Sequence, residues 1–289
     1  MSNQPHILVT GANGQLGMEL RELAKLHPEL KFYFVSKEEY SITNLVSLEE
    51  LFSKNSFSHC INCAAYTAVD KAETDEQQAF EINAIAPGNL AALCRKMNAI
   101  FIHISTDYVF DGNSQDAYKE DDPTHPIGVY GMSKLDGERS AIENNEQAII
   151  IRTSWVFSSY GKNFVKTMLR LMKENESINV VNDQFGSPTY TADLAKAILQ
   201  IIEVGGNPAP GIYHYCNLGI TNWYEFAIEI KKLTAANCDV HPITTAQYPT
   251  AAKRPQNSSL NTNKIRSVFN ITIPHWKDSL AQCISSLAE

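Results

Sequence analysis

The sequence predicts an α/β fold in which a doubly wound parallel sheet carries helices on both faces and a smaller C-terminal α/β portion follows. Three observations predict it. Short apolar runs alternate with amphipathic runs through the first half of the chain, a glycine-rich turn follows the first apolar run, and the alternation loosens after Trp155. We therefore expect a first domain over residues 1–155 and a second portion over residues 156–289, some of whose segments return to the first domain.

The first half predicts five strands separated by helices. An amphipathic pattern predicts a helix over residues 15–26, and Ser47-Leu-Glu-Glu50 is a capping-box signature that opens a short helix. A second capping signal, Thr74-Asp-Glu-Gln77, opens a helix that runs to residue 97 and that Pro87 kinks. A helix over residues 130–144 follows. The strands, each short and apolar, are expected at residues 6–10, 31–35, 58–62, 99–105 and 148–153.

The second portion predicts more helix than strand. Four amphipathic patterns predict helices over residues 163–173, 192–204, 223–234 and 276–287. Short strands are expected at residues 178–181 and 212–215. Residues 244–263 are rich in Pro, Asn, Ser and Thr and predict a loop. This portion is expected to pack on the carboxyl ends of the strands, where parallel sheets bind ligands.

Composition excludes several classes of function. The net charge of −8 argues against nucleic-acid or membrane-surface binding, because both require a basic face. No apolar run approaches the roughly 20 residues that span a bilayer. Residues 1–6 are polar and lead directly into a strand, unlike a signal peptide, so we expect a cytoplasmic protein. The six cysteines are expected to be reduced, mostly buried thiols.

The glycine-rich turn predicts a dinucleotide site of the Rossmann type in the first domain. Its spacing is GxxGxxG, between the first strand and the first helix. Small residues let the backbone approach a pyrophosphate, and the helix N-terminus offers free N–H groups and a positive dipole end. The alternative is a tight turn that binds no ligand. The cofactor-binding residues expected here are Gly11, Asn13, Gly14, Gln15, Leu16 and Gly17.

The end of the second predicted strand bears on the choice of cofactor. Sites that prefer NAD commonly carry an acidic residue here, whereas this chain has Ser36 and Lys37. A hydroxyl and a cation suit a 2′-phosphate better than a free hydroxyl. The sequence therefore favours NADPH, while NADH and a simple surface role for Lys37 stay open.

Tyr130 and Lys134 predict proton transfer. They lie four residues apart, on one face of the predicted helix, where a lysine would lower the pKa of a phenol. Tyr33 and Lys37 show the same spacing within a predicted strand, so spacing alone is weak evidence. The stronger sign is the strand ending in Thr106, whose hydroxyl could donate to a substrate carbonyl. Asp107 could bind a sugar hydroxyl or cap the next turn.

Several segments together resemble the extended short-chain dehydrogenase/reductase family, and within it the dTDP-4-dehydrorhamnose reductases. Thr106, Tyr130 and Lys134 match the family's catalytic triad. The resembling segments are Gly11–Gly17, Asn62–Glu73, Ser105–Gly112, Tyr130–Lys134, Arg152–Val156, Asn163–Phe164, Asn182–Thr189 and Arg254–Asn261.

The resemblance implies hydride transfer from a nicotinamide cofactor to C4 of dTDP-4-dehydro-β-L-rhamnose, which yields dTDP-L-rhamnose. The substrate would be a dTDP-sugar, with Trp155 beside the sugar and Arg254 at the diphosphate. Thr106 would also touch the cofactor. The further cofactor contacts that the resemblance implies are Gln15, Leu16, Cys63, Ala64, Ala65 and Tyr66.

Two features of the sequence depart from this family's pattern. Some members bind Mg²⁺ at a dimer interface through three glutamates, of which only Glu19 is present, with Ala192 and Ser286 at the other two positions. One carboxylate is too few for a dedicated Mg²⁺ site, so we expect no metal, and a homodimer stays open. Ser41 stands where the family usually has an aspartate near the adenosine.

Two other functions compete with the reductase. One is a dehydratase or epimerase on the same scaffold, but sugar dehydratases of this family typically carry an Asp-Glu pair after the threonine, whereas Asp107 is followed by Tyr108 here. The other is a non-catalytic regulatory subunit, like the β subunit of methionine adenosyltransferase, which would not need the triad. The presence of Thr106, Tyr130 and Lys134 favours an enzyme over the regulatory subunit.

Overall fold

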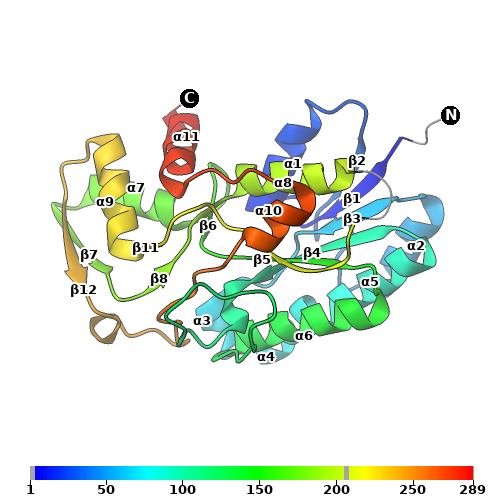
Figure 1. The fold of residues 1–289 in the computed structure, drawn as a ribbon, viewed down its shortest axis with the longest axis horizontal. Helices are drawn as coiled ribbons and strands as arrows, with labels where there is room; N and C mark the ends of the chain where they lie inside the picture. Colours follow the sequence, from blue (N-terminus) through cyan, green and yellow to red (C-terminus); the bar gives the residue numbers. More distant parts are fainter. Residues whose placement is uncertain (1–3, 205–207, 289) are drawn as a thin grey trace.

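A computed structural model describes residues 4–204 and 208–288. Its centre is a six-stranded parallel sheet in the order β10-β5-β4-β3-β1-β2 (Figure 1). The strands are short and apolar because helices cover both faces of the sheet. They span β1 His6–Thr10, β2 Lys31–Val35, β3 His59–Asn62, β4 Ile100–Thr106, β5 Ile149–Thr153 and β10 Gly211–His214.

The strand order creates a switch point between β1 and β3. From β1 the chain passes to β2 on one side and then returns to β3 on the other. Connections on opposite faces leave a crevice at the carboxyl ends of the strands, where α/β sheets bind ligands. The fold class expected from the sequence is therefore confirmed.

Three helices cover each face of the sheet. One hydrophobic cluster joins the sheet to α1, α8 and α10, and another joins it to α2, α5 and α6 (Figure 1). Both clusters contain residues of β1, β3, β4 and β5, which places these strands between the two layers of helices. The helices span α1 Gln15–Ala24, α2 Leu45–Lys54, α5 Ala86–Lys96, α6 Val129–Asn144, α8 Thr191–Glu203 and α10 Asn263–Phe269.

The second half forms a hydrophobic cluster of its own beyond the sheet. The cluster contains Phe157, Met168, Phe226 and Trp276, from helices and short strands that surround it. In contrast, β10, α8 and α10 return to the central sheet. The division at residue 155 itself stays a prediction. The outer elements are β6 Val156–Phe157, α7 Phe164–Glu174, β7 Ser177–Val181, β8 Phe185–Gly186, β9 Thr189–Tyr190, β11 Thr221–Asn222, α9 Trp223–Thr234, β12 Asp239–Ile243 and α11 Trp276–Ala288.

The expected helix from Thr74 to residue 97 is present, but it is not regular throughout. After the separate short helix α3 Val69–Ala72, the chain forms α4 Glu76–Phe80, a π-helical turn η1 Glu81–Ile85 and then α5 without a break. Pro87 has no N–H for the carbonyl of Asn83, four residues earlier. That carbonyl faces Gly137 of α6, where any side chain would overlap it. The wider π-helical turn therefore accommodates the Asn83 carbonyl, for which Pro87 has no N–H.

Other boundaries differ by a few residues. The helix expected to open at Ser47 begins at Leu45, because Asn44 accepts a hydrogen bond from the backbone of Ser47 and is itself a good N-cap. The polar stretch before residue 263 contains the short 3₁₀ turn η3 Thr245–Gln247. β12 and α10 were not expected.

The six cysteines are free thiols, as expected. Within the described ranges, no helix combines the length and the apolar character needed to cross a membrane. Residues 1–3 of the N-terminal segment that is unlike a signal peptide lie outside the described part of the chain.

Candidate active site

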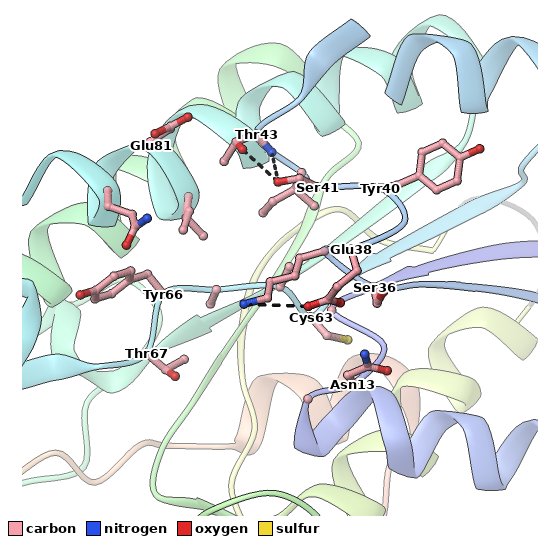
Figure 2. A pocket seen from close by; sticks show the side chains of 18 of the residues that line it. Asn13, Ser36, Glu38, Tyr40, Ser41, Thr43, Cys63, Tyr66, Thr67 and Glu81 are labelled. Atoms are coloured by element: carbon pink, nitrogen blue, oxygen red, sulfur yellow. Dashed lines mark hydrogen bonds and ion pairs between the residues drawn. The ribbon is translucent and has the colours of Figure 1, made fainter. Parts of the chain in front are cut away.

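A cavity of about 620 Å³ opens at the switch point of the sheet (Figure 2). It lies where β1, β2 and β3 end, so the loops after these strands supply its walls. Many residues expected to bind the cofactor line it. These are Gly11, Asn13, Gly14, Ser36, Lys37, Cys63, Ala64, Ala65 and Tyr66.

The glycines of the first loop are required by close backbone contacts. Gly11 has a φ of +66°, and a Cβ there would lie 2.6 Å from the backbone nitrogen of Ala64. A Cβ on Gly17 would lie 2.6 Å from the carbonyl oxygen of Gly11. Gly11 thus lets two loops meet beneath the cavity, and Gly17 lets α1 approach the turn. This cradle, open above the N-terminus of α1, fits a dinucleotide pyrophosphate.

Three residues expected at the cofactor lie elsewhere around the loop. Leu16 is buried in the core, and Gly17 packs on the turn. The side-chain oxygen of Gln15 accepts a hydrogen bond from Asn163 at 2.9 Å. None of the three lines the cavity, since α1 turns them toward other elements.

Ser36 and Lys37 stand at the rim of the cavity with two acidic neighbours. The backbone N–H of Ser36 donates to the Glu39 carboxylate at 3.0 Å. The Lys37 ammonium is 87% exposed and lies 4.0 Å from Glu38, an ion pair that contributes little to stability. Lys37 is therefore available to another anion at this rim.

Ser41, which departs from the family's usual aspartate, lines the cavity, and its hydroxyl lies 2.9 Å from that of Thr43. Another part of the cavity wall carried no sequence signal. Gln78 of α4 lines the cavity as well, and so does Glu81 of η1 (Figure 2); both are distant in sequence from the glycine-rich loop. Only the fold brings these segments together.

Asn83 fastens one cavity wall to the helix that carries Tyr130. Its amide oxygen accepts from the Tyr66 backbone N–H at 2.8 Å, and its amide nitrogen donates to the Tyr66 carbonyl at 3.0 Å. The same nitrogen reaches the Ser133 hydroxyl on α6 at 3.1 Å. The loop after β3 and the helix α6 are therefore held in one arrangement.

Thr106 and Tyr130 come together at the end of β4. A hydrogen bond with Thr106 lowers the pKa of the Tyr130 phenol, but burial outweighs it and the pKa rises to about 12. The expectation that Lys134 lowers this pKa is wrong for this structure. Burial dominates, and the Lys134 ammonium is directed elsewhere. At neutral pH the phenol keeps its proton.

Lys134 is 1% exposed and is held from beneath the site. Its ammonium donates to the Ile104 carbonyl at 2.7 Å and lies 3.3 Å from Nε2 of His103. Burial lowers the pKa of Lys134 to about 8, against the opposing charge of Glu138. The group is therefore a cation that can lose its proton near neutral pH.

Asp107 is a buried carboxyl beside the reactive hydroxyls. The Thr106 hydroxyl donates to its Oδ1 at 2.9 Å, so that the hydroxyl must turn to reach a substrate. Burial raises the pKa of Asp107 to about 6, although the hydroxyls of Ser258 and Thr106 lower it. Asp107 therefore orients the Thr106 hydroxyl, whereas Thr106 itself caps the following 3₁₀ turn, by accepting from the Tyr108 backbone N–H at 3.3 Å.

Trp155 adopts a left-handed backbone conformation, with φ of +47°. This conformation is rare for a bulky residue and marks strain that the surroundings must hold. The indole stacks on that of Trp223 at 3.5 Å between ring centroids and packs against Gly186. The partner Trp223, at the start of α9, was missed because only the tertiary fold brings it to β5.

Arg254 lies in a second cavity of about 460 Å³, together with Lys253 and Tyr248. Its guanidinium donates to the Asp70 carboxylate at 2.7 Å, and the same carboxylate accepts from the Ala252 backbone at 3.0 Å. The charge of Arg254 holds the pKa of Asp70 below its ordinary value. This cavity places an arginine and a lysine where an anionic ligand could enter.

Comparison with known proteins identifies the family. The family described as RmlD substrate binding domain matches residues 5–289. The chain belongs to this family.

The RmlD relatives are similar along their whole lengths. A protein of Aggregatibacter actinomycetemcomitans named dTDP-4-dehydrorhamnose reductase is 43% identical over 286 residues, which cover 95% of this chain and 96% of the relative. Solved structures of proteins with this name from Clostridium acetobutylicum and Bacillus anthracis each have a TM-score of 0.94, at 40% and 39% identity, and each comparison covers 98% of this chain and 100% of the other. The structure from Bacillus anthracis is a complex with NADP. The expected resemblance and Rossmann-type fold are therefore confirmed.

Proposed function

We propose that this member of the RmlD family reduces the C4 ketone of dTDP-4-dehydro-β-L-rhamnose to give dTDP-L-rhamnose, with NADPH as the preferred cofactor. One observation carries the proposal. A dinucleotide cradle lies at the carboxyl ends of β1 and β3, and Thr106 and Tyr130 meet at the end of the neighbouring strand β4, with Lys134 on the same helix as Tyr130, in a chain similar over its whole length to reductases of this name. Accordingly, the chain is an oxidoreductase that uses a nicotinamide cofactor.

The glycine-rich loop and the residues after β3 hold the cofactor. When bound, the nicotinamide supplies the hydride. Gly11 and Gly14 let the backbone approach the pyrophosphate, while Ala64 and Ala65 leave room along the opposite wall. Ser36 and Lys37 receive the 2′-phosphate, which supports NADPH over NADH, although NADH also fits the cradle.

Tyr130 supplies the proton to the oxygen that was the C4 carbonyl. An alkoxide is a far stronger base than a phenolate, so a phenol with a pKa of about 12 can still protonate it. The Thr106 hydroxyl turns from Asp107 to donate to this oxygen and stabilises its developing charge. Lys134 holds the cofactor ribose with its third N–H; in the ligand-free chain its charge does not lower the pKa of Tyr130.

The sugar and the diphosphate are bound by different groups. The stacked indoles of Trp155 and Trp223 offer an apolar wall to the sugar ring. Arg254 exchanges its contact with Asp70 for one with the diphosphate, because a guanidinium matches phosphate oxygens in geometry as well as charge. Lys253 adds a second cation in the same cavity.

A coupled assay tests the proposal. NADPH oxidation is measured with dTDP-4-dehydro-β-L-rhamnose, prepared enzymatically, and with NADH in parallel. We expect turnover with both and a higher kcat/KM with NADPH. Cofactor binding without turnover would favour the regulatory-subunit alternative, and a dTDP-sugar product formed without net cofactor oxidation would favour the epimerase.

Substitution of Tyr130 tests the proton donor. We expect Tyr130→Phe to lower kcat roughly 10²- to 10⁴-fold, the typical contribution of a general acid. Tyr33→Phe is the matched control, because Tyr33 also precedes a lysine by four residues but lies on β2. Equal activity of the two variants would mean that another group donates the proton.

The assembly and the metal remain proposals. We propose that the chain has no dedicated Mg²⁺ site and no dimer held by one, because Glu19 is engaged by the Ser158 hydroxyl at 2.5 Å and has no carboxylate at positions 192 and 286. Size-exclusion chromatography with light scattering, in the presence and absence of EDTA, measures the mass and any effect of the metal on it. A change of mass with EDTA would contradict this proposal.

A further inference from the structure

A buried chain of polar side chains runs beneath the sheet's ligand-binding edge to Lys134. The Thr10 hydroxyl lies 2.6 Å from the Asn62 amide, the other atom of that amide lies 3.0 Å from Nδ1 of His103, and Nε2 of His103 lies 3.3 Å from the Lys134 nitrogen. Thr10, Asn62 and His103 are each fully buried. A buried polar chain is costly unless each member is satisfied. No step of the proposed reaction uses Asn62 or His103.

The sheet itself aligns this chain. Thr10 is paired in register with Asn62 across β1 and β3, and Asn62 with His103 across β3 and β4. Residues at the same level of neighbouring strands point to the same face, here the face that α6 covers. The imidazole therefore reaches Lys134 by backbone geometry, without a flexible loop.

The hydrogen-bonding capacities couple the four groups. An ammonium can only donate, so a charged Lys134 requires an unprotonated Nε2 on His103 and a proton on Nδ1. Nδ1–H then needs the oxygen of Asn62, whose amide nitrogen turns to Thr10. A neutral Lys134 instead accepts from Nε2–H, and the Asn62 amide nitrogen donates to Nδ1. The second arrangement holds one proton fewer: the Lys134 ammonium gives a proton to Nε2, the Nδ1 proton is lost to solvent, and the Asn62 amide and the Thr10 hydroxyl turn, while no other heavy atom moves.

We propose that His103 and Asn62 are positioning residues that hold the Lys134 nitrogen in one place in both of its protonation states, by exchanging the imidazole tautomer together with the amide orientation. Lys134 donates one N–H to the Ile104 carbonyl and one to Nε2 of His103. Its third N–H is left for the cofactor ribose or the phenolate. This inference rests on the proposed role of Lys134.

The other charged groups near α6 do not replace this support. Glu138 raises the pKa of Lys134 through its charge, but its carboxylate is bound to Arg152 on β5 at 2.7 Å. Glu81 on η1, and Asp107 and Tyr108 on the 3₁₀ turn η2 Asp107–Val109, belong to elements packed against α6, and none of them contributes to the shift of the Lys134 pKa. His103 itself stays neutral, because burial and the lysine charge lower its pKa.

Paired substitutions test the proposal through the pH profile of kcat/KM. His103→Leu removes the acceptor of the ammonium, and we expect the alkaline limb to move down by about one pH unit, the size of a hydrogen bond to a charged group. Asn62→Asp fixes an acceptor opposite Nδ1, and we expect the limb to move upward. His103→Gln can still donate or accept and should restore most of the native profile. His59→Leu, at another buried histidine on β3, is the matched control and should leave the limb unchanged.

A pH-independent loss of rate in both His103 variants, with no movement of the limb, would overturn the proposal and leave His103 a structural residue. A second measurement needs no variant that folds poorly. Nitrogen NMR of the native holoenzyme reports the His103 tautomer, which should carry its proton on Nδ1 near pH 6.5 and shift toward Nε2 as Lys134 loses its charge. A single tautomer throughout would also overturn it. If Lys134→Met keeps full turnover while the tautomer shifts as expected, only the catalytic role of Lys134 fails.

Discussion

Replacing Lys134 with methionine should change how the stability of the protein depends on pH. The pKa of Lys134 falls from 10.5 to about 8 in the folded chain because its ammonium is buried. Below pH 8 the lysine is charged in both the folded and the unfolded chain, and folding must bury the charge. Between pH 8 and 10.5 the unfolded chain binds the extra proton, so stability rises with pH in that window.

The magnitude follows from the size of the shift. Each pKa unit corresponds to 1.36 kcal/mol, so burial of the ammonium costs about 3 kcal/mol near pH 7 and less than about 1 kcal/mol near pH 10. Methionine has no charge to bury and removes this contribution. The loss of the bonds to Ile104 and His103 offsets part of the gain, but that loss does not follow the same pH dependence.

Urea unfolding of the native chain and of Lys134→Met, at several pH values without cofactor, measures the effect. We expect the free energy of unfolding of the variant, relative to the native chain, to fall by about 2 kcal/mol between pH 7 and pH 10. Buried tyrosines and cysteines titrate in both proteins and cancel. Lys37→Met, at a lysine that is 87% exposed, should show no such trend. A constant difference between the native chain and Lys134→Met would refute the reasoning.

Three further substitutions probe other parts of the site. Gly11→Ala should weaken cofactor binding at least tenfold in a fluorescence titration, because its φ of +66° and the backbone facing it leave no room for a side chain; unchanged affinity would place the pyrophosphate elsewhere. Trp223→Ala should raise KM for the sugar substrate up to roughly tenfold by removing the stack on Trp155, with kcat less affected; an unchanged KM would remove the indole wall from the substrate site. Glu138→Gln should lower the free energy of unfolding by about 3–5 kcal/mol in urea, because it leaves the buried guanidinium of Arg152 unpaired; a loss below 1 kcal/mol would mean that the pair is not sealed from water.

Features that depend on residues close together in the sequence could be predicted from it. The loop from Gly11 to Gly17 was recognisable because the strand, the turn and the helix are consecutive. Tyr130 and Thr106 were paired because a predicted strand ends in Thr106 before the helix of Tyr130, and they meet as expected. The helix after Thr74 was predicted, but the π-helical turn within it was not; there Asn83 bonds Tyr66 and Ser133 of α6.

Features that depend on distant residues carried no local signal. Trp155 was expected near the sugar, but its strained backbone and its partner Trp223 follow from the packing of α9 against the end of β5. The direction of the Tyr130 pKa was wrong for a similar reason. Spacing on a helix shows which side chains share a face, whereas burial and the acceptors beneath Lys134 decide where its charge points.

The ion pair between Arg254 and Asp70 bears on the entropy of substrate binding. A free arginine side chain loses much rotational freedom when it is fixed on a ligand. Here Asp70 has already fixed the guanidinium before any ligand arrives, and Asp70 is about half exposed, so that water can solvate it again after the exchange. A diphosphate would then meet a cation whose ordering was completed when the chain folded.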